Sequence, residues 1–189
     1  MNRIVLDNWI SRTRGQIETA GKLTRGLSSQ QVHWHPAQGS WSIAQCLHHL
    51  AVSVRAYAPR IHRALQDPVM AQADGKAYAP RWLAGRFIEF VSPRSPKALK
   101  APGTFKPESD PPTDGLQDFI EMQEFLIHAL GAALPVDLNR NKLRSPALPL
   151  MTFTIGECFE MLIEHNDRHL GQAQRVRDHA DFPAGAAAR

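Results

Sequence analysis

The chain has 189 residues, of which 43% are hydrophobic and 21% are charged. This length suits one domain that buries its own core, and the composition excludes collagen, low-complexity polymers and disulfide-rich scaffolds. The sequence contains no run of about 18 apolar residues and no apolar segment near its start, so we expect neither a membrane span nor a secretory signal. The two cysteines, Cys46 and Cys158, lie in apolar helical patterns, and we expect them to be reduced in a cytoplasmic protein.

The formal net charge is +4, and the positive excess is concentrated in one segment. Residues 76–106 contain seven lysines and arginines but a single acidic residue, Glu89. No zinc-finger spacing or aromatic RNA-binding motif accompanies these cations, so we do not expect a nucleic-acid partner. We expect the basic segment to attract an anionic small molecule instead.

Apolar residues recur with helical periodicity in four segments. In chain order, these predicted helices cover residues 4–27, 41–65, 114–133 and 154–179. No β-hairpin signal and no useful alternating apolar run is found, which indicates an all-α fold, a four-helix bundle. We expect a single domain over residues 1–180, followed by a flexible C-terminal tail at 181–189.

A long connection, residues 67–113, joins the second and third predicted helices and holds eight of the 14 prolines. Within it, residues 81–91 are predicted to form one short helix. A connection of this length allows the second and third helices to run parallel, in an up-down-down-up order. In that order the second and fourth helices are antiparallel.

Two helix starts share one pattern: an aromatic residue, Ser or Thr, Ile, a small residue, Gln or Glu, and Cys. Ser42 and Gln45 form a predicted capping box at the first start, and Thr154 and Glu157 form one at the second. Each pair satisfies N–H groups of the first helical turn, so the sequence fixes the register of both helices.

Three of the nine histidines fall on inward-facing helix positions. His165 and His169 continue the apolar stripe of the fourth predicted helix, and residues four apart lie about 6 Å apart on one helix face, close enough to share a metal ion. His49 lies about 10 Å beyond the start of the second helix, and His169 about 13 Å before the end of the fourth. Antiparallel packing would therefore bring the three imidazoles to one level, as in a catalytic metal site. The alternative is that they are ordinary core histidines.

Two motifs resemble those of the DinB-like superfamily: Trp41-Ser42-Ile43 with His48-His49-Leu50, and Glu164-His165-Asn166-Asp167-Arg168-His169 with Gln172. The resemblance covers all four predicted helices. It implies an up-down-down-up four-helix bundle with a divalent metal ion, nickel or zinc, held by His49, His165 and His169. By the same motif His48 is the alternative to His49, on a face nearer to solvent.

The resemblance also implies a metal-dependent enzyme that acts on a small molecule. It would be either a hydrolase or a thiol-dependent S-transferase that uses a low-molecular-weight thiol as cofactor. The alternative is a metal-binding stress-response protein without catalytic activity. The HExxH motif of zinc metalloproteases is absent, because the residue after His165 is Asn166. Exposed apolar strips on helical bundles favour association, so we expect a homodimer.

Two polar residues lie one helical turn from His49. Gln45 either caps the helix with Ser42 or hydrogen-bonds a metal-ligating histidine, and Ser53 is a candidate for the second role.

The long connection is too rich in proline for a simple crossover, and we expect it to pack over the histidines. Its expected apolar anchors are Trp82, Phe87 or Phe90. In that position Arg81, Arg86 or Arg94 would lie near an anionic ligand. The alternative is a surface excursion beside the bundle.

Overall fold

The computed structural model describes residues 2–72, 75–96, 101–109, 111, 115–148 and 150–184. In chain order, its elements are α1 (Asn2–Thr24), α2 (Ser29–Val32), α3 (Ile43–Gln66), α4 (Trp82–Val91), the 3₁₀ helix η1 (Gly103–Phe105), α5 (Gly115–Ala132), β1 (Lys142–Arg144), β2 (Thr152–Thr154) and α6 (Ile155–Arg177). The long helices α1, α3, α5 and α6 confirm the four predicted helices, and α4 is the short helix expected within the connection.

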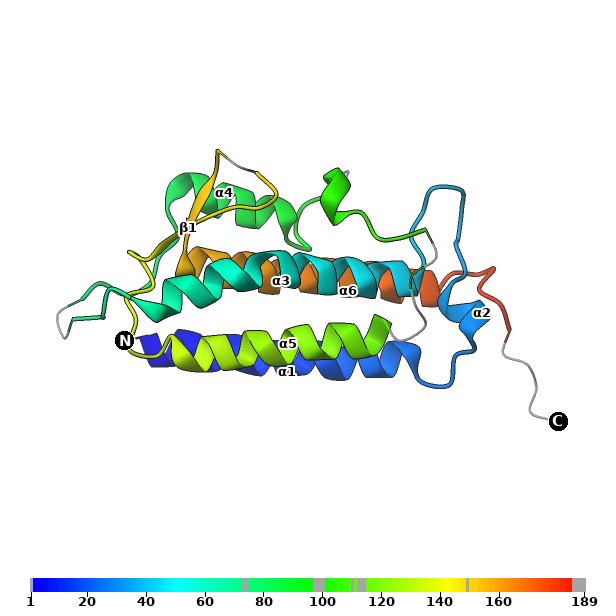
Figure 1. Ribbon diagram of the computed structural model, residues 1–189. Coiled ribbons are helices and arrows are strands. Elements are labelled where there is room, and N and C mark those ends of the chain that lie inside the picture. The colour runs from blue at the N-terminus through cyan, green and yellow to red at the C-terminus, as the bar shows by residue number, and fades with distance from the viewer. Residues whose placement is uncertain are drawn as a thin grey trace.

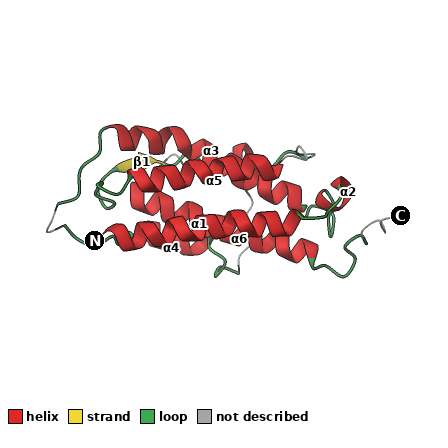
Figure 2. Ribbon diagram, turned by 90° about the horizontal axis from the view of Figure 1, so that it is seen from below, coloured by secondary structure: helices red, strands yellow, loops and turns green. Residues whose placement is uncertain are grey.

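The four long helices form the predicted up-down-down-up bundle (Figure 1). Helices α1 and α6 run in one direction, whereas α3 and α5 run in the other. Both α1 and α3 pack against α5 and α6, so α1 and α3 lie diagonally opposite each other. Figure 2 shows the same four helices from below, lying along a common axis. Helices α3 and α6 are therefore adjacent and antiparallel.

Two apolar clusters fill the bundle, and a layer of buried amides separates them along the helices. One cluster includes Leu6, Leu126 and Phe159, and the other includes Leu23, Phe119 and Leu170. Between them, each of three helices contributes one buried amide: Gln16 from α1, Gln123 from α5 and Asn166 from α6. Asn166 Nδ2 donates to Gln16 Oε1 at 3.1 Å and to Gln123 Oε1 at 2.7 Å. These hydrogen bonds fix the height of α6 relative to α1 and α5.

Both predicted capping boxes are present. Gln45 N donates to Ser42 Oγ and Ser42 N donates to Gln45 Oε1, each at 3.2 Å. Thr154 and Glu157 exchange the same two hydrogen bonds at the start of α6. The starts of α3 and α6 are therefore held where the sequence placed them.

The structure contains a short β-hairpin for which the sequence has no signal. Strands β1 and β2 pair antiparallel, with Leu143 opposite Phe153, and Ser145 N donates to the Met151 carbonyl at 2.9 Å. Each strand has only three residues, which is too short to produce an alternating apolar pattern. The hairpin lies on the α3–α6 layer together with α4 (Figure 1).

The expected tail is described only up to residue 184, and residues 185–189 lie outside the described part of the chain. Within the described part, the Phe182 ring packs edge-on against Trp34 at 5.5 Å. Gln31 Nε2 donates to the Pro183 carbonyl at 2.9 Å. Among the described helices, none is long and apolar enough to cross a membrane.

Gly156 provides a test of packing at the start of α6. An added Cβ would lie 2.5 Å from the Tyr78 ring and 2.9 Å from the Leu138 carbonyl oxygen. We therefore expect Gly156→Ala to lower the free energy of unfolding by about 1–3 kcal/mol, although alanine ordinarily stabilises a helix.

The matched control is Gly15→Ala in α1, where an added Cβ meets no atom within 4 Å. This variant should be stabilised by up to about 1 kcal/mol. Urea denaturation of both variants measures the difference, and equal stability of the two would contradict the packing seen at Gly156.

Candidate metal centre

Three histidines from two helices meet in the middle of the bundle. His49 comes from α3, and His165 and His169 come from α6. One ring nitrogen from each histidine lies within 4.8 Å of the other two, and the ring centroids are 4.6–5.0 Å apart. The expected meeting of these three side chains is confirmed.

The outer nitrogens of two rings are held by hydrogen-bond acceptors. His49 Nδ1 lies 2.5 Å from the Phe105 carbonyl oxygen, and His169 Nδ1 lies 2.9 Å from Gln172 Oε1. Because an oxygen of this kind only accepts, each Nδ1 carries the proton and the Nε2 lone pair is left free. His49 Nε2 points inward, 3.2 Å from His165 Nε2. The free lone pairs of His49 and His169 are therefore on nitrogens of a cluster that one His165 nitrogen completes within 4.8 Å.

All three imidazoles are held in the neutral form. Burial disfavours the charged ring and lowers the pKa of His49 to about 4 and that of His169 to about 3. Burial and the two neighbouring histidines hold the pKa of His165 well below its ordinary value. Neutral imidazole is the form that binds a metal ion.

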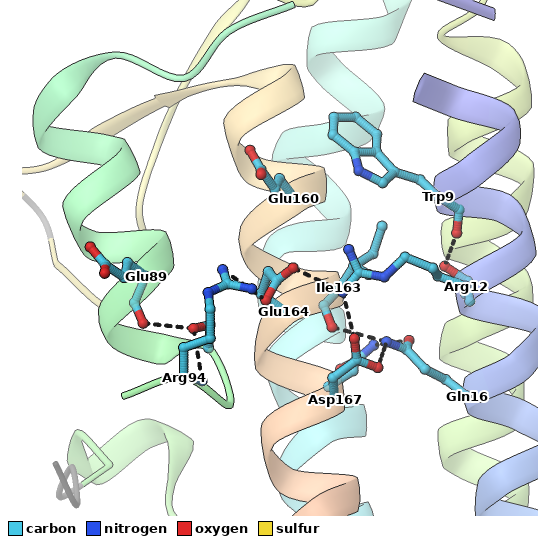
Figure 3. Close-up of polar contacts among 12 residues, drawn as sticks. Trp9, Arg12, Gln16, Glu89, Arg94, Glu160, Ile163, Glu164 and Asp167 are labelled. Atoms are coloured by element: carbon cyan, nitrogen blue, oxygen red, sulfur yellow. Dashed lines mark hydrogen bonds and ion pairs between the residues drawn. The ribbon is translucent and has the colours of Figure 1, made fainter. Parts of the chain in front are cut away.

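Helix α6 is held by polar contacts one or two positions away from these histidines in the sequence (Figure 3). Glu164 Oε1 accepts a hydrogen bond from Arg12 Nη2 at 2.9 Å, and the same guanidinium contacts Asp167 Oδ2 at 2.5 Å. Gln16 Nε2 donates to Asp167 Oδ1 at 2.6 Å. These bonds tie α6 to α1, which sets the rotation that turns His165 and His169 toward α3.

The three histidines lie within a long groove between α3 and α6. The groove has a volume of about 1220 Å³. It is lined by Trp41, just before α3, and by every fourth residue along α3: Gln45, His49, Ser53 and Tyr57. At 1.5 Å per residue, the row on α3 extends for about 18 Å. We call this cavity the central groove; the histidines lie near its middle.

The long connection covers the central groove, as expected. Its residues Phe90, Pro102 and Phe105 line the groove, and the Phe105 carbonyl touches His49 directly. Arg168 Nη1 donates to the carbonyls of Ser92 and Ser95 at 2.9 and 3.0 Å, which holds this segment against α6.

Of the three residues expected as alternative anchors, Phe87 and Phe90 fill this role and Trp82 does not. Phe87 packs against Phe153 at 5.7 Å and, like Phe90, lines the groove. Trp82 anchors nothing, because 79% of its side chain is exposed. It lies at the first turn of α4, on the face turned to solvent.

None of the three arginines expected near an anionic ligand lines the groove, and each is paired with a carboxylate outside it. Arg81 binds Glu157, Arg86 binds Glu89 and Arg94 binds Glu164. The cations that do line the groove are Lys106 from the connection and Arg168 and Arg175 from α6. Lys97 and Lys100 of the basic segment lie outside the described residues.

Gln45 and Ser53 support the backbone rather than a histidine ring. Besides capping α3, Gln45 Nε2 donates to the carbonyls of Glu108 and Ser109 at 3.1 and 3.3 Å. Ser53 Oγ donates to the main-chain carbonyl of His49 at 2.7 Å. His48, the alternative to His49, points away from the cluster and accepts a hydrogen bond from Glu108 N at 3.4 Å.

Sequence reasoning did not assign a role to the two groups that orient the rings. Gln172 belongs to the motif named above, and its place three residues after His169 could have shown that it reaches this ring. The Phe105 contact is made by a main-chain carbonyl and leaves no trace in the sequence.

Comparison with known families decides the assignment. The model of the DinB superfamily matches residues 12–173. The chain belongs to the DinB superfamily. Its fold is similar to that of YfiT from Bacillus subtilis, described as "a probable metal-dependent hydrolase with an unusual four-helix bundle topology". The TM-score is 0.61 at 14% sequence identity, and the match covers 94% of this chain and 89% of YfiT. No curated protein matches the chain.

Gln45→Ala tests whether this residue acts on the helix or on the histidines of this DinB-superfamily protein. Loss of the capping box should lower the free energy of unfolding by about 1 kcal/mol. Metal affinity should stay unchanged, because the Gln45 side chain bonds Ser42 and the 108–109 backbone. Thermal melting and metal titration of one preparation check both parts. A tenfold loss of metal affinity without a loss of stability would show instead that Gln45 supports a ligand.

The lowered histidine pKa values predict acid sensitivity of the metal-free protein. Each folded-state pKa lies below the unfolded value of about 6.5, so the unfolded chain takes up protons first as the pH falls. Stability should therefore drop between pH 6.5 and about 4, by on the order of 2 kcal/mol between pH 7 and pH 5 for His49 alone. Urea denaturation in the presence of a chelator measures the effect.

The control for this experiment is His169→Gln, which should show a weaker dependence on pH in the same range. Glu157 does not interfere in this pH range. Burial favours its protonated form, but the hydrogen bonds from Arg81 and Thr154 outweigh burial and lower its pKa, so the stability that Glu157 contributes is lost only below about pH 4.5. Equal stability of the wild type at pH 7 and pH 5 would contradict the buried neutral state of the histidines.

Proposed function

We propose that this DinB-superfamily protein is an enzyme that binds one divalent metal ion at His49, His165 and His169. The observation that supports the proposal is the convergence of three neutral imidazoles on one point inside a large groove. Three protein ligands leave coordination positions for water or substrate, as catalytic sites do.

The residues present fit a transition-metal ion. Their ligand atoms are all imidazole nitrogens, which suit nickel and zinc and are poor ligands for magnesium or calcium. Two of the rings are fixed in the tautomer that directs Nε2 to the centre, by Phe105 and Gln172. Nickel or zinc is therefore the proposed cofactor.

When bound, the metal ion would supply Lewis acidity that lowers the pKa of a water or thiol ligand. The protein offers little competing base chemistry at this place. Asp167 is the acid that lines the described part of the groove, and it is engaged by Arg12 and Gln16. The side chains of the groove thus bind and orient the reactants, whereas activation of the nucleophile falls to the metal site.

The charge of the groove favours an anionic small-molecule substrate. Lys106, Arg168 and Arg175 line it, and the three histidines beside them carry no charge of their own at neutral pH. Unlike charges attract, so these cations raise the local concentration of anions near the centre.

Two reactions suit this arrangement: hydrolysis by a metal-bound water, and transfer to the sulfur of a low-molecular-weight thiol. The size of the groove, about 1220 Å³, gives room for a thiol beside the substrate. A metal-binding stress-response protein without turnover is the alternative, and the large groove beside the histidines favours the enzyme. A cytoplasmic homodimer completes the proposal.

Replacing His169 with Ala should abolish tight metal binding and leave a folded bundle. The stability of the bundle comes from apolar burial along four helices, and the two apolar clusters do not include His169. Elemental analysis of protein purified without a nickel column, followed by zinc titration and circular dichroism, checks both parts.

His62→Ala is the matched control, because His62 is an exposed histidine of α3 that lies outside the cluster. This variant should bind one equivalent of metal like the wild type. Wild-type affinity in the His169→Ala protein would remove this residue from the site. A wild-type protein that contains and takes up no transition metal would end the proposal.

A further inference from the structure

The central groove is divided chemically along its length. Towards the end of α6, beyond the histidines, it is lined by Gln172 and Arg175. In the opposite direction its walls are almost entirely apolar. We call this part the apolar arm; it is lined by Tyr57, Phe87, Phe90, Val91, Ala147, Leu148, Met161 and Leu162.

The few polar atoms of the apolar arm are bonded within the protein. The Tyr57 hydroxyl lies 2.8 Å from Ser145 Oγ, in a buried hydrogen bond. The hydroxyl of Ser53, at the inner end of the arm, is bonded to the His49 carbonyl. Among the described side chains, a molecule in the arm would therefore meet carbon and sulfur surfaces, because the hydroxyl groups already have partners.

The walls of the arm are fixed before any ligand arrives. Met161 and Leu162 are buried in the bundle core, and Val91 is 5% exposed. Phe87 is held against Phe153, and Leu148 N is bonded to Ser145 Oγ at 3.1 Å. Figure 1 shows α4 and the β1–β2 hairpin over the α3–α6 layer. Phe87, Phe90 and Val91 of α4 and Leu148 of the hairpin loop line the arm on this side.

The arm is open to the metal centre at its inner end. From His49 to Tyr57 it follows α3 for about 12 Å. Leu148 lies at its rim, with 39% of the side chain exposed. The walls of the arm are held apart by the packing of the surrounding helices, and the arm is continuous with the histidines. A preformed apolar cavity of this kind is typical of a binding pocket for an apolar group.

We propose that the substrate of this protein joins a polar reacting group, held at the histidines, to an apolar chain or ring that occupies the apolar arm. This inference rests on the proposed function, because the histidines are taken as the reacting end. The arm then selects among substrates by the size of the apolar group, and the cations near the histidines select for charge.

Four straight-chain carboxylates, butanoate, hexanoate, octanoate and decanoate, test the arm by calorimetric titration of the zinc-loaded protein. All four probes share the carboxylate, so the change of affinity with chain length reports on the arm. Affinity should rise about three- to fourfold for each added methylene until the arm is filled. In Leu148→Glu, which places a charge at the rim, this dependence should be lost and octanoate affinity should fall about tenfold or more.

Leu150→Glu is the matched control, because it adds the same charge to the same hairpin loop at a fully exposed residue that does not line the groove. It should retain the chain-length dependence of the wild type. Both residues are exposed, so both variants should fold, and their melting temperatures verify this.

The two proposals fail in different ways. Affinity that does not depend on chain length in a wild-type protein that binds zinc would overturn the apolar arm and leave the metal site standing. Equal effects of Leu148→Glu and Leu150→Glu would also overturn it. A chain-length dependence in a protein that takes up no metal would support the arm and remove the metal-dependent function.

Discussion

The antiparallel contact between α3 and α6 sets the height at which their polar residues meet. Capping boxes fix the residues at which both helices begin. On the side of α6 that faces α1 and α5, the hydrogen bonds from Asn166 to Gln16 and Gln123 fix the position of α6 along the bundle axis. The histidines lie at the same level as this amide layer, between two apolar clusters. A shift of α6 by one turn, about 5.4 Å, would separate its histidines from His49 and break the amide layer as well. Stability and site geometry are thus set by the same contacts.

Sequence reasoning succeeded where a local pattern determines the outcome. Helical periodicity, two capping boxes and the spacing of His165 and His169 are local, and they sufficed to place the three histidines together. It failed where contacts are made by long-range partners. Arg81 and Arg94 are cationic in the sequence, but Glu157 and Glu164 engage them across the fold. The three-residue strands of the hairpin are equally invisible, because tertiary packing and not propensity forms them.

The distribution of charge in the structure differs from that in the sequence. The described arginines of the basic segment are all paired with carboxylates. Two of these carboxylates belong to α6, so the segment serves mainly to attach the connection to the bundle. Arg168 of α6 in turn donates hydrogen bonds to two backbone carbonyls of the connection. Among the residues that the structure describes, the positive lining of the central groove therefore comes mostly from α6, the helix that also carries His165 and His169. Charge and candidate ligands are positioned by one rigid element.

The hydrogen bond between His49 and the Phe105 carbonyl responds differently to substitutions than to insertions or deletions. A carbonyl belongs to every amino acid, so replacing the side chain at position 105 leaves the acceptor in place. Substitution scanning would score this position by its buried ring alone and overlook its part in orienting the imidazole. Inserting or deleting one residue in η1 would move the carbonyl away from the ring. The number of residues in this segment is therefore constrained more tightly than their identities. Relatives can keep the contact between this carbonyl and the histidine even where every side chain of the segment differs.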